Sequence, residues 1–204
     1  MRKPLICILC VVLMLAVAFG AELIPFEQTV RRSYHHELSA DAAYCGSFEQ
    51  SASQVDSLGL LTQGSFCSHL PLVVIDTGAQ ALSQDYETVV SLAVIDNEGG
   101  HNHLDGELAF SSETLIKLRG NSSIFFDKKQ YRLTFVNSEA DLTHRSISVM
   151  GMPADSEWVL NGPFLDKTAL RNYLMYNLAG DLMDWAPNIR YCELFMDGVY
   201  QGLY

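Results

Sequence analysis

The chain has 204 residues, of which 49% are hydrophobic and 18% are charged, and its formal net charge is −11. This composition supports a folded core and argues against an intrinsically disordered chain. The excess of acidic side chains argues against nucleic acid as a partner, because nucleic-acid-binding proteins need clustered Lys and Arg to displace counterions.

Residues 1–20 have the pattern of a signal peptide. Arg2 and Lys3 form a positive start, residues 5–19 are an uncharged apolar run, and Ala18 and Gly20 are small residues at the −3 and −1 positions of a cleavage site. A run of this length is short for a membrane span. We therefore expect export to a secreted or cell-surface location, with no membrane span after cleavage. An uncleaved N-terminal anchor is the alternative.

Cleavage would leave three cysteines, Cys45, Cys67 and Cys192. An exported chain can keep disulfides, and Cys45 with Cys67 would close a modest loop. Because three is an odd number, at least one thiol stays free, pairs with another chain, or pairs with a partner beyond residue 204. No CxxC spacing remains in the mature chain, so a structural zinc site is not expected.

Residues 21–69 are expected to be a loosely structured leader, and an ordered domain is expected over residues 70–204. Asp105-Gly106 predicts a hairpin turn. In residues 130–136 the side chains alternate, with Tyr131 on the apolar face, which predicts a half-buried antiparallel sheet. The expected strands of this part lie in residues 70–78, 87–96, 107–110, 115–119 and 130–136.

The later part changes character. A short strand is expected at residues 158–160, followed by a helix over residues 167–183 with Asp166 as its N-cap. Asp197-Gly198 then predicts a hairpin between strands at residues 190–196 and 199–204. The fold class is therefore α+β, an antiparallel β-rich lobe followed by a helix and a β-hairpin. The chain stops within the last strand, so we expect it to be truncated at its C-terminus.

The start of the predicted helix carries two cations on the side expected to be buried. Lys167 and Arg171 share that side with an apolar stripe formed by Leu170, Leu174 and Leu178. Cations oppose the helix dipole at this end, so an anion between them would resolve the conflict. That anion is either a phosphate or an internal carboxylate that would make a fold-fixing ion cluster. The carboxylates considered are those of Asp166, Asp155 and Glu193.

A second group of donors lies at the end of a predicted strand. The loop consists of Arg119, Gly120, Asn121, Ser122 and Ser123. It either wraps phosphate oxygens or is an ordinary hairpin loop. Lys129 has the parity of the apolar face that follows it, so it should point inward and need a carboxylate or phosphate partner. Lys128 is expected to face water.

Several of these segments, in this order, resemble the spore coat protein H (CotH) kinase family. The segments are residues 70–78, 119–123, 128–133, 150–172 and 197–204. The resemblance covers roughly residues 70–204. It implies a kinase-like α+β fold, similar to atypical protein kinases, that binds ATP with Mg²⁺ and phosphorylates Ser or Thr on surface or coat proteins.

On this chain the resemblance makes Lys129 the phosphate-contacting lysine and places the Arg119–Ser123 loop beside the nucleotide. It also places the helix start beside the cleft, through Asp166, Lys167, Arg171 and Asn172. The catalytic and metal-binding acidic residues of the family are expected after Tyr204, so neither set is assigned and the chain alone is expected to be inactive. Asp197 has the pattern of a turn residue.

The alternative is a non-catalytic module on the same fold, which would assist surface or coat assembly or bind polysaccharide. Trp158, Trp185 and the tyrosines of the last hairpin could form its binding face. The same aromatic side chains could equally pack in the core.

Overall fold

The computed structural model describes residues 66–97 and 100–204. The predicted signal peptide, residues 21–65 of the predicted leader, and Cys45 lie outside the described residues. Cys67 is disulfide-bonded, and Cys192 is a free, buried thiol.

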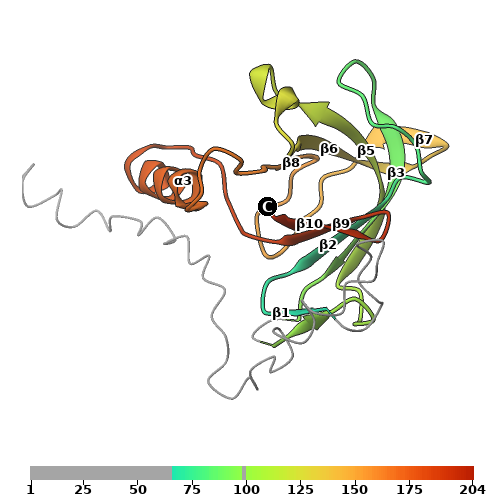
Figure 1. Ribbon diagram of the computed structural model, residues 1–204, viewed down its shortest axis with the longest axis horizontal. Coiled ribbons are helices and arrows are strands. Elements are labelled where there is room, and N and C mark those ends of the chain that lie inside the picture. Colours follow the sequence, from blue (N-terminus) through green and yellow to red (C-terminus); the bar gives the residue numbers. More distant parts are fainter. Residues whose placement is uncertain (1–65, 98–99) are drawn as a thin grey trace, which may run out of the picture.

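The described part is built on one large curved sheet with an α-helix to one side (Figure 1). The sheet order is β10-β9-β2-β3-β5-β6-β7, and β8 also pairs with β6. Every neighbouring pair is antiparallel except β2 with β9, which is parallel. The strands are β2 (Leu72–Asp76), β3 (Thr88–Ile95), β5 (Phe110–Arg119), β6 (Gln130–Ser138), β7 (Asp141–His144), β8 (Glu157–Leu160), β9 (Glu193–Met196) and β10 (Val199–Leu203). The α+β class is confirmed.

A second, two-stranded sheet pairs β1 (Cys67–Ser68) with β4 (Asn102–His103). The turn after β4 is closed by the Gly106 N–H, which donates to the His103 carbonyl at 2.9 Å. Because this turn and the segment after it occupy residues 104–109, the separate strand expected at 107–110 is wrong. Phe110 instead begins β5, which is therefore longer than the strand expected at 115–119.

The alternation predicted in β6 is confirmed on its apolar face, where Tyr131, Leu133 and Phe135 are buried. Thr134 lies on the opposite face of β6, and it is also buried, at 1% exposed. The sheet is therefore covered on both sides at this point rather than half-buried. The main core cluster includes residues of β2, β3, β5, β6 and β8 together with Cys192, Leu194 and Tyr204.

The β9–β10 hairpin is confirmed at the predicted Asp197-Gly198 turn. Both turn residues are left-handed, with φ of 50° at Asp197 and 76° at Gly198, as the tight twisted hairpins require. The Asp197 carboxylate also accepts hydrogen bonds from the Thr77 N–H and hydroxyl, each at 2.7 Å. The hairpin is thereby tied to the end of β2, with which β9 pairs in parallel.

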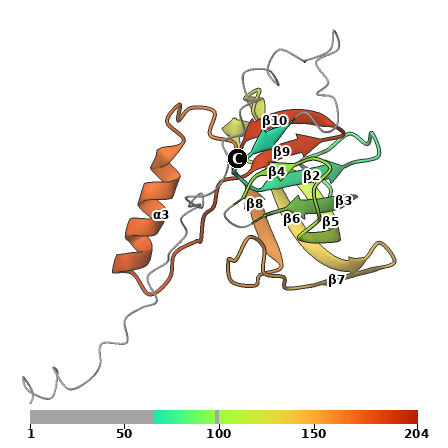
Figure 2. The ribbon, with the colours of Figure 1, turned by 90° about the horizontal axis from the view of Figure 1, so that it is seen from below.

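Helix α3 (Leu170–Leu182) stands away from the sheet (Figure 2). None of its thirteen residues is buried, so the predicted burial of the Leu170, Leu174 and Leu178 stripe is wrong. The helix also begins three residues later than expected, because Ala169 adopts a left-handed φ of 56° that cannot belong to a right-handed helix. No helix in the described residues combines the length and apolar character needed to cross a membrane.

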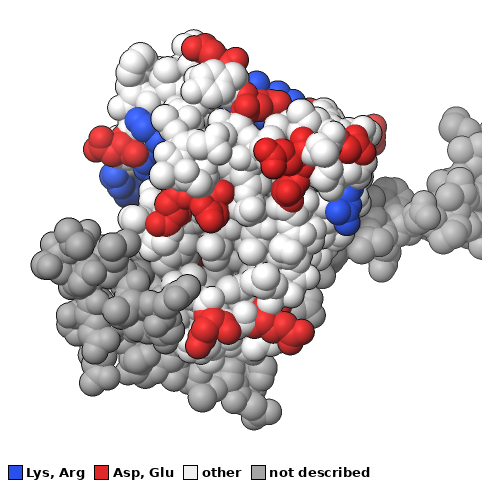
Figure 3. Space-filling view, turned by 90° about the vertical axis from the view of Figure 1, so that its right-hand side faces the viewer, with Lys and Arg blue, Asp and Glu red and all other residues white. Residues whose placement is uncertain are grey.

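Charge is distributed unevenly over the surface. On the face shown in Figure 3, most of the surface is uncharged, acidic side chains form several separate clusters, and basic side chains form fewer ones. The net charge of −11 is therefore not gathered into one acidic patch on this face.

Candidate functional site

A cavity of about 590 Å³ lies against one face of the sheet and is the candidate site. Its floor consists of apolar side chains from three strands. Val73 of β2 and Val94 of β3 are directly paired across the sheet, and Leu133 and Phe135 of β6 complete the surface with Leu92. Alternate residues of a strand share a face, so these side chains point into the cavity together. A concave apolar floor of this size suits a small organic ligand.

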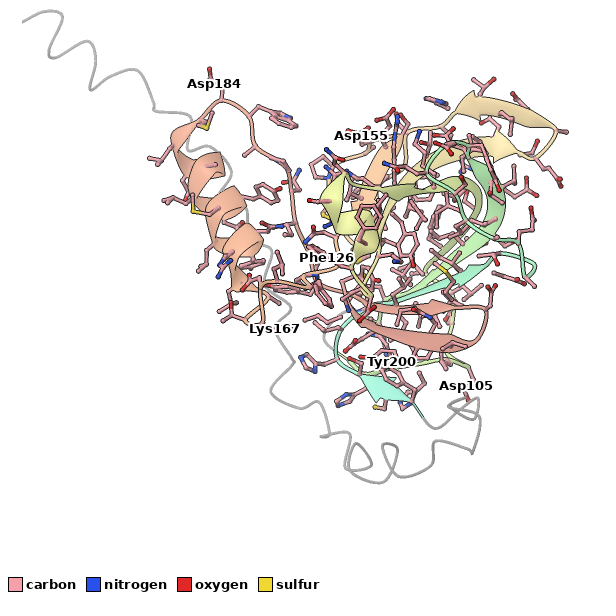
Figure 4. The ribbon with its side chains drawn as sticks, turned by 45° about the horizontal axis from the view of Figure 1, so that its top comes forward. Asp105, Phe126, Asp155, Lys167, Asp184 and Tyr200 are labelled. Atoms are coloured by element: carbon pink, nitrogen blue, oxygen red, sulfur yellow. The ribbon has the colours of Figure 1, made fainter. Side chains whose placement is uncertain are left out.

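Two connecting segments form the walls. One contains β8 and the residues around it, from Val149 to Pro163, and the other runs from Trp185 to Cys192 between α3 and β9. In Figure 4, Asp155 marks the wall beside β8, and Asp184 marks the end of α3 from which the other segment returns to the sheet. The first wall therefore includes a strand of the sheet, since β8 pairs with β6, whereas the second is a connection without a strand.

Both tryptophans of the chain line this cavity, one on each wall. Trp158 is half-buried, with its ring edge toward Phe135 at a centroid distance of 6.5 Å. Its indole N–H donates to the Asp155 carbonyl at 2.9 Å. Trp185 is 74% exposed. The expectation of core packing therefore fits Trp158 but not Trp185. The ring of Trp185 is exposed and can contact a ligand.

Some polar side chains of the cavity already have hydrogen-bond partners in the protein, and one does not. Arg190 Nη1 donates to the Met150 carbonyl and so joins the two walls. Arg119 Nη1 donates to Gln130 Oε1 at 3.2 Å. Asn188 differs, since its Oδ1 is buried and has no hydrogen-bond partner among the described residues. Such an oxygen is unusual in a folded protein, where buried polar atoms are almost always paired.

Of the residues predicted to border a nucleotide, only Arg119 and Asn172 line this cavity. Gly120 follows β5 with φ of 124°, and its carbonyl accepts from Gln84 Nε2 at 2.5 Å. Asn121 precedes the short 3-10 helix η1 (Ser122–Phe125) without capping it through its side chain. The loop Arg119–Ser123 therefore turns away from the cavity immediately after Arg119.

The two lysines before β6 differ from the prediction. Lys129 Nζ donates to the Ile124 carbonyl at 2.9 Å, so the ammonium is directed into the η1 loop. Lys128 was expected to face water, but its Nζ lies 4.3 Å from the centre of the Tyr204 ring and donates to the Gln201 carbonyl at 3.1 Å. Burial lowers the pKa of the Lys128 ammonium below its ordinary value. Lys128 is therefore part of the packing between the loop and β10.

The helix start forms a local hydrogen-bonded cluster. Asp166 Oδ1 accepts from the Thr168 hydroxyl at 2.7 Å, and Oδ2 accepts from the Arg171 N–H at 2.8 Å. These bonds, the Thr168 hydroxyl first, lower the pKa of the Asp166 carboxyl. Asp166 therefore binds the first turn of the helix, but the prediction that it is the N-cap is wrong, because Ala169 holds that position.

The two cations of that region are on the surface. The Arg171 side chain is 76% exposed and its Nε lies 3.9 Å from Asp166 Oδ1. Lys167 Nζ lies 4.7 Å from the centre of the Phe164 ring. Since α3 is not buried, the expected conflict between two cations and a buried helix face does not arise. Of the carboxylates considered, Asp166 is the one that pairs with Arg171.

The structure does bring the two predicted segments together. The Phe126 ring after η1 stacks on Phe164 at a centroid distance of 4.9 Å, close to Lys167 (Figure 4). Gly162 permits this approach, because a Cβ there would lie 2.5 Å from the Lys129 carbonyl. The predicted loop and helix start are therefore neighbours, but they meet through aromatic packing beside the cavity.

The wall from Trp185 to Cys192 was missed by sequence reasoning, which assigned its first half to a helix stop and its second half to a strand. In the structure β9 begins only at Glu193, so Arg190 and Cys192 precede it. One feature of the sequence could have pointed to this wall: Asn188 and Arg190 lie between Pro187 and an apolar strand. That feature alone does not indicate a cavity wall.

The described residues offer no metal site. Across residues 66–97 and 100–204, no group of three or more His, Cys, Asp and Glu side chains could hold a metal ion. Two carboxylates, of Asp155 and Glu157, line the cavity. Glu157 Oε1 is already paired with Arg132 Nη2 at 2.5 Å.

Comparison with known families gives one match. Residues 116–204 match the family model described as CotH kinase protein, and the comparison with curated proteins gives no match. The match begins within β5 and includes both walls of the cavity, whereas β2 and β3 precede it. A kinase family implies the use of ATP and a metal ion, and the CotH name associates it with the spore coat. The resemblance drawn from the motifs is thus confirmed for the C-terminal part of the chain, where residues 116–204 are similar to the CotH kinase protein family.

Proposed function

We propose that this chain is an exported CotH-like atypical protein kinase, or part of one, and that its cavity receives the adenosine part of ATP. The phosphoacceptor would be a Ser or Thr of a surface or coat protein. The family match supports the reaction class. The disulfide at Cys67 is in keeping with export, because disulfides persist in oxidising compartments.

The observation that carries the proposal is the cavity itself. Its volume of about 590 Å³ lies within the usual range for ligand pockets. The lining is rich in aromatic rings, which stack well on a flat base. The aromatic lining residues are Phe135, Trp158, Tyr176, Trp185, Tyr191 and Tyr204.

The phosphates would extend toward the η1 loop in this proposal. Arg119 lines the cavity and also begins that loop, and in this proposal its guanidinium would contact phosphate oxygens. Lys129, on the same loop, would give up the Ile124 carbonyl to reach them. ATP with its metal supplies the phosphoryl group when bound. The described residues do not form a metal site, so no step is assigned to the metal.

The test, made in the full-length protein, is transfer of radiolabelled phosphate from ATP in the presence of Mg²⁺, to the protein itself or to added casein. Lys129→Ala should reduce labelling about 10²-fold or more if the ammonium stabilises the transferring phosphate. Lys117→Ala is the matched control, because Lys117 pairs with Glu87 at 3.6 Å and does not line the cavity. Equal labelling in both variants contradicts the role of Lys129, and absence of both ATP binding and labelling contradicts the kinase function.

A non-catalytic binding module is the second candidate function. It is favoured by the exposure of Trp185 at 74% and of Leu182 at 75%, which leaves an apolar surface at the end of α3. Binding of polysaccharide or a coat protein that is lost in Trp185→Ala, without any response to ATP, would favour this function.

A further inference from the structure

The wall between α3 and β9 is continuous, since every residue from Trp185 to Cys192 lines the cavity. Hydrogen bonds fix the two residues of this wall at positions 190 and 191, which follow Asn188 closely. The Tyr191 hydroxyl donates to the Ala169 carbonyl at 2.8 Å, and Arg190 donates to the Met150 carbonyl. Asn188 therefore lies on a wall whose position is set by its neighbours.

The fold does not use the amide oxygen of Asn188. Its Oδ1 is buried, with no hydrogen-bond partner in the described part of the chain. Leaving an amide oxygen buried and unpaired destabilises the folded state. A ligand donor could remove that cost, because the terminal torsion of Asn is soft and the amide can turn toward the cavity.

We propose that Asn188 is the residue that determines base specificity, favouring adenine over guanine; this rests on the proposed binding of a nucleotide in the cavity. An Asn amide pairs with adenine through two complementary bonds, accepting from the N6 amino group and donating to N7. Guanine presents O6 in place of the amino group, so the amide oxygen would face another acceptor. The aromatic walls stack on either base and cannot make this distinction.

The experiment uses the two tryptophans as reporters, because both line the cavity. ATP and GTP are titrated separately against the full chain while tryptophan fluorescence is followed, and calorimetry repeats each titration. The wild type should bind ATP at least about tenfold more tightly than GTP, which is the usual discrimination of one paired amide. In Asn188→Leu the ATP affinity should fall about tenfold while the GTP affinity changes little.

Two further variants separate this role from a structural one. Asn188→Asp keeps an acceptor for the N6 amino group and should retain part of the preference for ATP. Asn137→Leu is the control, because Asn137 is exposed and its amide donates to Asp141 outside the cavity. Thermal melting of Asn188→Leu should be unchanged or raised, since the variant removes an unpaired buried oxygen.

The outcomes are distinguishable. If neither nucleotide binds the wild type by fluorescence or calorimetry, the proposed function fails and this inference fails with it. If ATP binds but Asn188→Leu keeps the same ratio of ATP to GTP affinity, the specificity role alone is overturned. A lowered melting temperature with an unchanged ratio assigns Asn188 to the fold. If Asn188→Leu does not fold, the ratio of ATP to GTP affinity in Asn188→Asp decides between a specificity role and a structural role of Asn188.

Discussion

At the scale of single residues, Asp197 combines a strained turn position with a tie to another strand. Its φ of 50° is tolerated by Asp and Asn better than by most residues. Its carboxylate accepts two bonds from Thr77, which is 2% exposed. We expect Asp197→Ala to lower the free energy of unfolding by about 2 kcal/mol, measured by urea denaturation.

Asp197→Asn is the matched control for that prediction. Asn keeps the left-handed tolerance and one acceptor oxygen, so it should recover about half of the loss. If the Ala variant is as stable as the wild type, the Thr77 bonds do not contribute to stability.

Sequence reasoning assigned Asp197 to its turn but assigned the lysines before β6 differently from the structure. The alternation of side chains is a property of strand geometry, and β6 begins only at Gln130. Parity extended backward to Lys128 and Lys129 therefore carried no information about the direction of either side chain. The contacts of Lys128 with Tyr204 and Gln201 join residues more than seventy positions apart, which no local pattern encodes.

At the scale of elements, the predicted and observed structures differ most clearly at α3. Its leucines were expected to be buried, yet Leu174 is 59% and Leu178 is 52% exposed. Periodicity predicts which residues share a helix face, but it does not say whether another element lies against that face. The start of the helix was misplaced because the left-handed Ala169 depends on the turn that Asp166 organises.

Because the leucines of α3 are exposed, we expect substitutions there to have little effect on the free energy of unfolding. Leu174→Glu and Leu178→Glu should each change the free energy of unfolding by less than about 0.5 kcal/mol, because surface substitutions remove little packing. Leu194→Ala is the contrasting core variant, since Leu194 is 0% exposed, and it should cost about 2–5 kcal/mol. Chemical denaturation of the three variants checks both values. A loss in the Glu variants as large as that of Leu194→Ala would mean that α3 is packed.

At the scale of the whole molecule, the sequence predicted most strands and the final hairpin but not how they are assembled. The parallel pairing of Leu72 with Glu193 joins the first and last parts of the sheet, about 120 residues apart. Turn residues specify hairpins between neighbours in sequence, whereas a distant parallel pair depends on the packing of the complete core. The cavity could not be predicted for the same reason, because its floor and walls come from segments that lie far apart in the chain.

The same assembly buries several weak acids around the end of β10. Burial raises the pKa of Cys192 to about 12, above its ordinary value of 9.0. Burial likewise raises the pKa values of Tyr131, Tyr200 and Tyr204, and the carboxylate of Glu193 adds to the shift at Tyr200. Lys128 changes in the opposite sense, because burial lowers its pKa.

These shifts predict alkaline destabilisation. A group whose pKa is raised by folding stabilises the native state below its unfolded pKa, and that contribution is lost as pH rises through the folded value. For the three buried acids, Cys192, Tyr131 and Tyr204, the loss begins near pH 9–10, the ordinary values of Cys and Tyr, and each proton that folding fully retains lowers the stability by about 1.4 kcal/mol per pH unit. Tyr200 is 38% exposed, so solvent screening makes its contribution smaller. Lys128 offsets part of the loss, since its lowered pKa makes folding more favourable as pH rises through that value. The melting temperature should therefore fall as pH rises from about 9 to 11.

Tyr204→Phe provides the control for the pH dependence. Tyr204 is 7% exposed, and its hydroxyl donates to the Lys129 carbonyl at 3.1 Å. The variant should melt at a lower temperature than the wild type at pH 7, because it loses this bond. It should nevertheless lose less stability as pH rises from about 9 to 11, because one buried ionisable hydroxyl is gone. Parallel melting curves across that range would show that Tyr204 does not contribute to the alkaline transition, and the remaining dependence would then belong to Cys192, Tyr131 and Tyr200.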